Sequence, residues 1–507
     1  FFFTPTPASA ILSGLVGSEM CIRDRMNVLH WHLTEDQGWR IEIDKYPKLT
    51  DVGAWRKEKD GSIYGGFYTK EQIKDVVDYA YNLGVNIVPE IELPGHCVAA
   101  LASYPEYSCT GGPFEVEKDW GVFKDIYCAG NDSTFVFLEN VLDEIIELFP
   151  SKYIHIGGDE APKYRWENCS KCKKRIQDEN IQDTHELQSY FIQRIENYIS
   201  GKGKKLIGWD EILEGGLANN ATVQSWRGFE GALEAVKTGH DAIVSPTSHA
   251  YFDYDLDAID LKKVYNFDPI PLGVPSDKEK HIIGGECNMW TERAPQITID
   301  SKVFPRLLAM SEVLWDYPII RDYNLFYERV QAHYKRLDVL GVNYGLETKP
   351  IAISSEYEDG QFYVTLNKGA KDLKLFYQIN QEETVLYDST FIINESADIK
   401  TWAVKNDDNS YGDSLQIELY KHKGLGAKIS DLNTYGKTYD GGGNNAIVNG
   451  LRGGLNFRDG HWQGYFGTDF EATITFDSIQ RIDSVISSFY QYNLSWIFMP
   501  KQIIVYT

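Results

Sequence analysis

Between Met26 and about Gly345, short apolar runs alternate with longer amphipathic stretches. This pattern is typical of repeated βα units around a parallel sheet. The apolar runs predict strands at Asn27–Leu33, Val85–Leu93, Tyr153–Gly157, Lys205–Trp209, Thr222–Trp226, Ala242–Ser245 and His281–Met289. The amphipathic stretches predict helices at Lys70–Leu83, Asp132–Phe149 and Thr184–Ser200, the second with Asp132 and Ser133 as N-cap residues.

The predicted fold class is α/β, a (β/α)₈ TIM barrel that lacks its first βα unit, because a closed barrel needs eight strands and the pattern supplies seven. Residues 1–25, FFFTPTPASAILSGLVGSEMCIRDR, share neither the periodicity nor the composition of the chain after Met26, and we interpret them as a foreign leader. They have neither the basic start of a signal peptide nor the roughly 18 apolar residues of a membrane span. Strands two to eight of the barrel are therefore assigned to residues 26–345.

After Gly345 the pattern changes to short alternating strands divided by Asn, Asp and Gly, which predicts a small β-sandwich over residues 346–420. A linker, HKGLGAK, leads to a third segment, residues 426–507, with aromatic runs and a further alternating pattern. The alternation continues up to Thr507, so this segment is expected to be truncated. All-β domains of the sandwich type thus come after the barrel.

The formal net charge of −24 at pH 7 opposes binding to phosphate backbones, and we expect no nucleic-acid partner. The seven cysteines form neither a dense disulfide framework nor a repeated metal-ligand pattern. For the lone CxxC of Cys169 and Cys172, a short disulfide or free thiols are favoured over zinc. Cys109 and Cys128 flank a Gly-rich loop, and a disulfide between them is expected if the protein is exported.

The motif HIGGDE, from His155 to Glu160, comes after a predicted strand and ends in two adjacent carboxylates. Side chains of adjacent residues diverge, so Asp159 and Glu160 cannot act on one bond as an ordinary acid and nucleophile pair, and they must have different tasks. The two glycines before them allow an unusual backbone and the close approach of a ligand. Two acids on a solvated loop are the alternative, but the position after a strand, with His155 at its start, favours a functional site.

A second motif, HWHLTEDQGWR, places two His, two Trp and several charges at the end of the first predicted strand. Neither an HExxH helix nor a third matched ligand accompanies His30 and His32, so no metal site is predicted, and a core position is the alternative for His30. Further strand ends supply PEIELPGH, GWDE, QSWRG, YFDY and GGECNMWTE. Three of them contribute a Trp, and three indoles above a barrel would wall a pocket as wide as one pyranose ring.

Residues 26–345 resemble the family 20 glycoside hydrolases through HWHLTEDQGWRIEIDKYPKLTDVGAWR, PEIELPGH, HIGGDE, GWDEIL, QSWRG and WTE. The resemblance implies a retaining exo-β-N-acetylhexosaminidase that removes terminal β-linked GlcNAc or GalNAc. In this family the acetamido group of the substrate attacks the anomeric carbon, which makes it an exception to chemistry with two protein carboxylates. Neither a cofactor nor a metal is implied.

The resemblance also implies catalytic roles for three residues. Glu160 matches the general acid/base, and Asp159 matches the residue that orients the acetamido group and stabilises the oxazolinium ion. Tyr251 would hydrogen-bond the acetamido carbonyl oxygen. His96 and Asp36 would support Glu160, although many relatives have two Asp where this chain has Glu35 and Asp36.

The resemblance implies substrate-binding roles in the same way. Trp209, Trp226 and Trp290 would wall the acetamido and ring pocket. Asp253 and Glu292 would bind hydroxyls at the far end of the sugar. His155 is placed among the supporting residues.

The first strand of the family carries an Arg that grips ring hydroxyls, and this sequence has no matching position. The alternative function is therefore a non-catalytic sugar-binding protein or an inactive fragment. Residues 426–507 resemble a discoidin-like (coagulation factor 5/8 type) carbohydrate-binding module through WQGYFGTDFEATITF and SWIFMPKQIIVYT. The resemblances imply a glycan or chitooligosaccharide substrate and an extracellular, periplasmic or cell-surface location without a membrane span.

Overall fold

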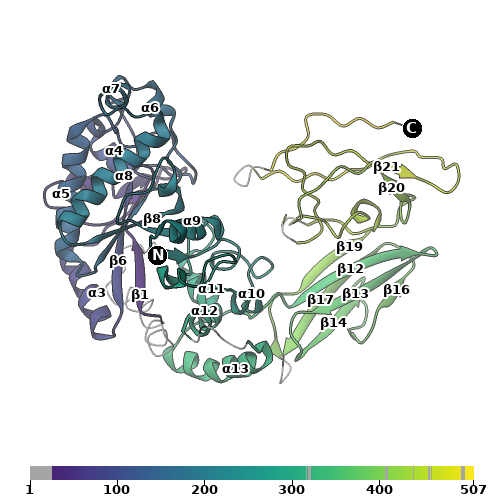
Figure 1. Cartoon of the computed structure of the whole chain (residues 1–507). Coiled ribbons are helices and arrows are strands. Elements are labelled where there is room, and N and C mark those ends of the chain that lie inside the picture. The colour runs from purple at the N-terminus through teal and green to yellow at the C-terminus, as the bar shows by residue number, and fades with distance from the viewer. Residues whose placement is uncertain are drawn as a thin grey trace. The chain divides into compact units, whose positions relative to one another are not determined.

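The computed structural model describes residues 26–315, 317, 321–405, 409–437, 439–454, 457, 459–492 and 497–506 (Figure 1). The chain divides into two compact units, with the boundary between Glu347 and Thr348. The predicted leader, residues 1–25, lies outside the described residues. Among the helices of the described residues, none has the length and apolar character needed to cross a membrane.

The first unit is built on a parallel sheet of seven strands arranged in chain order. They are β1 (Val28–His32), β6 (Asn86–Leu93), β7 (Tyr153–Gly157), β8 (Lys205–Trp209), β9 (Thr222–Ser225), β10 (Ala242–Val244) and β11 (Ile282–Gly285). Each lies within its predicted apolar run, so the predicted strands are confirmed. Strand β11 ends before the predicted Met289 because Asn288 turns to pair with the segment after β10, where its N–H donates to the Ala250 carbonyl at 2.7 Å.

The sheet curls until its first and last strands approach each other. Within the described part of the chain, no backbone pairing joins β1 to β11. Instead, Nδ1 of His30 on β1 lies 2.8 Å from Oε1 of Glu286, directly after β11. A parallel sheet curled in this way belongs to the TIM-barrel-like α/β class, as predicted, and the described residues supply seven of its strands.

Helices between the strands cover the outer face of the sheet (Figure 1). The three predicted helices are α3 (Lys70–Asn82), α5 (Asp132–Leu148) and α8 (Thr184–Gly201), and a fourth, α9 (Glu230–Thr238), packs against β9 and β10. The predicted N-cap of α5 is wrong by one residue. Asn131 is the cap, because its backbone is extended and its side chain accepts a hydrogen bond of 3.3 Å from the N–H of Ser133.

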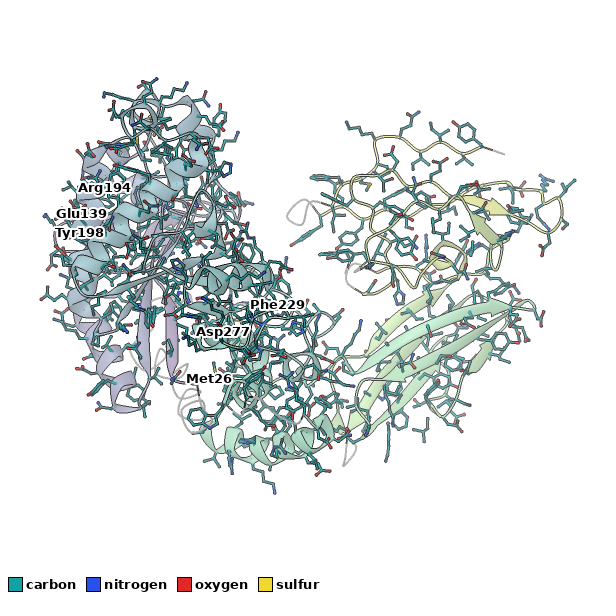
Figure 2. All side chains as sticks on the ribbon, in the orientation of Figure 1. Met26, Glu139, Arg194, Tyr198, Phe229 and Asp277 are labelled. Atoms are coloured by element: carbon teal, nitrogen blue, oxygen red, sulfur yellow. The ribbon has the colours of Figure 1, made fainter. Side chains whose placement is uncertain are left out.

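Helices α5 and α8 lie side by side on this outer layer. Figure 2 shows Glu139 of α5 beside Arg194 and Tyr198 of α8. The Tyr198 hydroxyl donates to Asp143 at 2.8 Å, and the Arg194 guanidinium lies 3.9 Å from the ring centre of Phe135. Polar and cation–π contacts on the rim thus complete an interface whose centre is apolar.

The second unit contains two antiparallel sheets. The first sheet consists of β12 (Ile351–Glu358), β13 (Gln361–Lys368) and β16 (Phe391–Ile393). The second consists of β15 (Val385–Leu386), β14 (Leu373–Ile379), β17 (Ala397–Lys405), β18 (Asn409–Ser410) and β19 (Leu415–Leu419). Burial alternates along β12, where Ile351, Ile353 and Ser355 face inward, so this strand has one buried and one exposed face.

The last part of the second unit holds few regular elements. Strand β20 (Lys428–Ser430) pairs with β21 (Thr473–Thr475), and a short 3₁₀ helix, η5, spans Ala446–Val448. The backbone elsewhere in the described residues between 426 and 506 runs mainly in turns and irregular segments.

Candidate active site

The two adjacent acids lie on a tight turn at the carboxyl end of β7. Gly157 and Gly158 have φ angles of +66° and +94°, and Glu160 itself has a φ of +42°. A Cβ atom on Gly157 would collide with the carboxylate of Glu92 on β6. Glycine is therefore required here, both for its backbone angle and for the room it leaves beside a buried acid.

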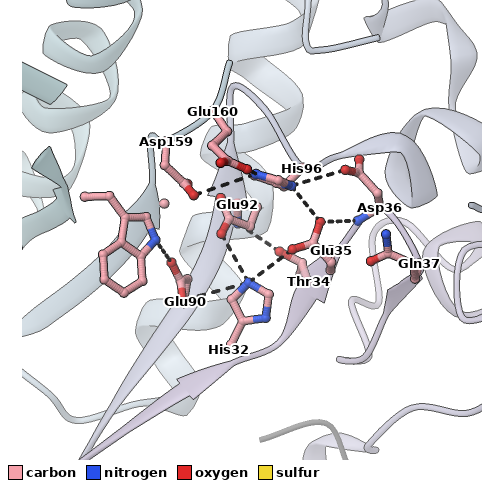
Figure 3. A network of polar contacts seen from close by, with 12 residues as sticks. His32, Thr34, Glu35, Asp36, Gln37, Glu90, Glu92, His96, Asp159 and Glu160 are labelled. Carbon is pink, nitrogen blue, oxygen red and sulfur yellow. Dashed lines mark hydrogen bonds and ion pairs between the residues drawn. The ribbon is translucent and has the colours of Figure 1, made fainter. Parts of the chain in front are cut away.

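His96 is the point on which the acids converge (Figure 3). Its Nε2 atom lies 3.7 Å from Oδ2 of Asp159 and 3.5 Å from Oε2 of Glu160. Side chains of adjacent residues diverge on a regular backbone, but the positive φ at Glu160 turns these two toward the same imidazole nitrogen. The charges of the two carboxylates and of His96 therefore influence one another.

The other nitrogen of His96 faces the loop after β1. Nδ1 lies 2.9 Å from Oε1 of Glu35 and 3.2 Å from Oδ2 of Asp36. The second Asp36 oxygen accepts a hydrogen bond of 2.9 Å from the N–H of Val98, which fixes this carboxylate. The structure thus places the predicted partner Asp36 on His96, and it adds Glu35, to which the sequence motifs alone assigned no role.

Burial and charge act against each other in this cluster. Burial raises the pKa of Asp159 to about 7, although the nearby His96 lowers it. Burial likewise raises the pKa of Glu35 to about 7. For His96, burial opposes the charge, but Glu35 and Asp159 outweigh it and hold the pKa well above its usual value. A cationic imidazole next to acids that titrate near neutral pH can hold or release a proton.

Glu90 on β6 forms the centre of a second polar network, inside the barrel. Its Oε1 accepts a hydrogen bond of 2.9 Å from Nε1 of Trp209 and lies 2.8 Å from Nδ1 of His155. Its Oε2 lies 3.1 Å from Nε2 of His30. Burial would raise the pKa of Glu90, but His155 and His30 hold it well below the usual value.

Sequence reasoning assigned no role to Glu90 or Glu92, although both lie within PEIELPGH. Both carboxylates are buried, and Oε1 of Glu92 lies 3.1 Å from Nε2 of His32. Their spacing in the sequence could have predicted this position. Residues i and i+2 of a strand face the same side, so Glu90 and Glu92 both point into the interior of the barrel.

The predicted aromatic residues lie in two pairs. The rings of Trp209 and Trp290 are 6.1 Å apart, and those of Trp226 and Tyr251 are 6.3 Å apart. The hydroxyl of Tyr251 interacts with the side chain of Trp290, which links the pairs. Nε1 of Trp226 donates a hydrogen bond of 3.0 Å to Glu211, another acid that the sequence did not single out.

Asp253 and Glu292 lie close enough to repel each other. Burial raises the pKa of Asp253 to about 6, and the charge of Glu292 adds to the effect. Asp253 is 3% exposed, and its Oδ1 has no hydrogen-bond partner among the described residues; the same holds for Oδ1 of Asp159. A buried carboxylate oxygen without a protein partner is suited to accept a hydrogen bond from a ligand.

Several His and carboxylate groups of the site lie close enough to hold a metal ion. In the group of His30, Glu90 and His155, each imidazole already faces the Glu90 carboxylate, at 2.8 to 3.1 Å. Four cysteines form the remaining group. The disulfides considered for Cys109 with Cys128 and for Cys169 with Cys172 are not formed, since all four are free thiols that meet at one place.

The family model described as "Glycosyl hydrolase family 20, catalytic domain" matches residues 19–318. A beta-hexosaminidase of Porphyromonas gingivalis is 47% identical over 333 residues, which are 63% of this chain and 43% of that protein. A beta-hexosaminidase of Vibrio furnissii is 35% identical over 57% of this chain and 51% of its own length. The chain therefore spans about half the length of these two relatives.

Solved structures show the same similarity. A beta-N-acetylhexosaminidase from Bacteroides fragilis has a TM-score of 0.60 at 34% identity, over 68% of this chain and 70% of that one. An exo beta-N-acetylglucosaminidase from Vibrio harveyi, solved in complex with N-acetylglucosamine, has a TM-score of 0.61 at 32% identity, over 68% of this chain and 58% of that one. Since the family model covers more than half of the residues, this chain belongs to glycosyl hydrolase family 20.

Proposed function

We propose that this protein is a retaining exo-β-N-acetylhexosaminidase that hydrolyses terminal β-linked GlcNAc or GalNAc on glycans or chitooligosaccharides. The observation that carries the proposal is the convergence of Asp159 and Glu160 on Nε2 of His96, at 3.7 and 3.5 Å. The beta-hexosaminidase names of the relatives support it. Family members use the substrate's own acetamido oxygen as nucleophile, so one protein acid/base and one orienting carboxylate suffice.

In the first step Glu160 donates its proton to the leaving glycosidic oxygen while the acetamido carbonyl oxygen attacks the anomeric carbon. The C–O bond to the leaving group breaks, and an oxazolinium ion forms. Asp159 accepts a hydrogen bond from the acetamido N–H, and its anion is favoured by the positive charge that develops beside it. The pKa of Asp159, which burial raises to about 7, would therefore fall as this charge develops.

In the second step Glu160, now a carboxylate, takes a proton from the water that attacks the anomeric carbon. The two inversions give net retention of configuration. His96 is a positioning residue in this scheme, because it holds both carboxylates and is itself held by Glu35 and Asp36. Its positive charge also favours the anion of Asp159.

The sugar-binding part of the proposal rests on the aromatic pairs and the unpartnered acids. Trp209, Trp226 and Trp290 would wall the acetamido and ring pocket, and the Tyr251 hydroxyl would donate to the acetamido carbonyl oxygen. Asp253, buried with a free acceptor oxygen, would take a sugar hydroxyl together with Glu292. Two indoles with ring centres 6.1 Å apart offer apolar faces to a pyranose.

The proposal extends to the second unit and to the location of the protein. The two antiparallel sheets support the small β-sandwich predicted for residues 346–420. The discoidin-like module of residues 426–507 would hold the enzyme near its polymer. An extracellular, periplasmic or cell-surface location, where the enzyme would meet polymeric glycans, is also part of the proposal.

Release of 4-nitrophenol from its N-acetyl-β-glucosaminide by the full chain tests the activity. Glu160→Gln keeps the size of the side chain but removes the proton, so kcat should fall by ~10²- to 10⁴-fold. Glu71→Gln, an exposed acid at the start of α3, is the matched control and should leave kcat unchanged. A folded chain that binds GlcNAc without turnover would instead identify a sugar-binding protein, and an active Glu160→Gln variant would overturn the role of Glu160.

Substrate assistance has a separate test. Replacing the acetamido group of the substrate by mono-, di- and trifluoroacetamido groups lowers the basicity of the carbonyl oxygen stepwise. We expect kcat/KM to fall steeply along this series, because the carbonyl oxygen is the nucleophile. Equal rates along the series would mean that a protein side chain attacks the sugar, which would reject this mechanism while keeping the hydrolase activity.

A further inference from the structure

We propose that Cys109, Cys128, Cys169 and Cys172 bind one zinc ion as a structural site in the first unit. The four Sγ atoms all lie within 4.8 Å of one another. Cys128, Cys169 and Cys172 are buried, and Cys109 is partly buried. The site is separate from the carboxylate cluster and does not depend on the proposed hydrolase activity.

The distances between the sulfur atoms match a tetrahedral metal site. Sγ of Cys172 lies 3.7 Å from Sγ of Cys109 and 3.6 Å from Sγ of Cys128, and the Cys128 and Cys169 sulfurs are 3.8 Å apart. A tetrahedron of four thiolates around zinc, with Zn–S bonds of about 2.3 Å, has edges of about 3.8 Å. A zinc ion at the centre of the four sulfurs would therefore need little rearrangement.

The pattern of contacts favours one shared ion over two disulfides. A disulfide joins each sulfur to one partner at about 2.05 Å. Here Cys128 contacts both Cys169 and Cys172, and Cys172 contacts both Cys109 and Cys128. Each of these two sulfurs thus faces two others at almost equal distances, as the ligands of a central cation do.

Two separate backbone features bring the ligands together. An isolated bridge between Ser108 and Tyr127 places Cys109 and Cys128 on adjacent chain segments. Cys169 and Cys172 occupy the N-cap and the first turn of α7 (Ser170–Asp178), three residues apart and so on the same side of the helix. The result is two pairs of ligands from distant parts of the sequence, which is typical of closed structural zinc sites.

The turn after Cys128 is shaped to fit against this helix. A Cβ atom on Gly130 would collide with the backbone of Lys171 and Cys172, so only glycine allows the approach. All four donors of the group are thiols, whereas harder ions prefer oxygen ligands. The donor set therefore selects a thiophilic divalent cation, and a closed set of four thiols is that of structural zinc.

The proposed ion would tie together the two loops that frame the carboxylate cluster. Cys109 and Cys128 lie between β6, which is followed by His96, and α5, whereas Cys169 and Cys172 come after the loop that carries Asp159 and Glu160. A hydrogen bond already joins these two segments, since Nε1 of Trp166 donates to the Tyr127 carbonyl at 2.8 Å. Zinc would add four bonds at the same place, with release of the thiol protons as thiolates form.

The test is the metal content of the full chain, purified without chelator and measured by plasma mass spectrometry for zinc and iron. We expect about one zinc per chain. Cys172→Ser and Cys128→Ser should each reduce it at least tenfold, whereas Cys287→Ala, which removes a cysteine outside the cluster, should leave it unchanged. In the cobalt-loaded protein, an intense thiolate-to-cobalt charge-transfer band in the near ultraviolet would report on the ligands independently of folding yield.

Counting the free thiols of the wild-type chain distinguishes a zinc site from two disulfides. Titration in denaturant with a chelator and without reductant should reveal seven free thiols, the number of cysteines in the sequence. Four fewer thiols together with no bound metal would mean two disulfides and would overturn the proposal. Seven thiols with no metal, or iron in place of zinc, would overturn it equally.

Discussion

The indole nitrogen of Trp209 donates a 2.9 Å hydrogen bond to the fully buried carboxylate of Glu90, 119 positions earlier in the chain. The buried indole of Trp209 is therefore held by a hydrogen bond in the polar interior of the barrel and not by apolar packing alone. The acceptor of this bond is a carboxylate whose pKa is held well below its usual value by His155 and His30, against the effect of burial.

Trp209→Phe should destabilise the protein by about 1–3 kcal/mol, because it leaves the buried Glu90 carboxylate with one hydrogen bond fewer. Urea unfolding followed by circular dichroism measures the change. Trp315→Phe is the control, since this indole is 62% exposed, and its effect should stay within about 0.5 kcal/mol. Equal effects of the two substitutions would mean that the bond contributes nothing to stability.

Gly157→Ala should destabilise more than Gly84→Ala does. Both glycines have positive φ angles, +66° and +78°, so both substitutions carry the backbone penalty of about 1 kcal/mol. Only at Gly157 does the new methyl group collide with Glu92, whereas nothing lies within 4 Å at Gly84. Overpacking should add roughly 1–3 kcal/mol. Chemical denaturation of both variants compares them, and similar losses would contradict the tight contact with Glu92.

Glu211→Gln should stabilise the protein at alkaline pH. Burial, and then the charge of Asp159, raises the pKa of Glu211 from 4.5 to about 8. Because the folded state holds this proton more tightly than the unfolded state, wild-type stability falls as pH rises from about 4.5 to about 8. The variant lacks this loss and can still accept the hydrogen bond from Trp226.

The advantage of Glu211→Gln should therefore be absent below about pH 4.5 and reach a plateau above about pH 8, on the order of 1 kcal/mol or more. Thermal midpoints measured from pH 4 to pH 9 give the profile. Glu147→Gln, at an exposed position of α5, should show no such trend. A difference that grows toward acid pH would contradict the raised pKa.

His96→Asn should move the acidic limb of kcat/KM for the proposed hydrolysis to higher pH. His96 lowers the pKa of Asp159 against the effect of burial, so without its charge the Asp159 pKa rises above about 7. Asp159 then loses its anion at a higher pH than in the wild type. The pH profile measures this shift separately from any general loss of activity.

The matched control is His185→Asn, whose imidazole is 57% exposed and lies away from the cluster. Its profile should coincide with that of the wild type. An acidic limb that stays in place, or moves to lower pH, in His96→Asn would show that the imidazole does not set the charge of Asp159.

The strands and the positions of the motifs could be predicted from sequence because both depend on local patterns. Short apolar runs bounded by polar residues predicted all seven strands, and HIGGDE lies directly at the end of β7 as expected. Glu90, Glu92 and the four-cysteine group could not be assigned in the same way. Their partners are 41 to 119 residues away along the chain, and only the tertiary fold decides which charges and thiols meet.

The N-cap of α5 shows a second kind of limit. Asn131, Asp132 and Ser133 all have good cap side chains, so the composition alone does not separate them. The backbone identifies Asn131 as the N-cap, because its conformation is extended, with φ −106° and ψ +111°. The convergence of Asp159 and Glu160 on His96 was missed for the same reason. It depends on backbone φ angles, which cannot be predicted from the identity of two adjacent acidic residues.

The left-handed backbone at Glu160, with φ +42°, has a consequence for how this protein would change under selection. Glycine or asparagine would relieve about 1 kcal/mol of strain at that position, and either would remove the carboxylate. A library screened only for yield or heat resistance should therefore enrich Glu160→Gly and Glu160→Asn. Under the proposed function, such a variant would gain stability and lose the acid that cleaves the sugar.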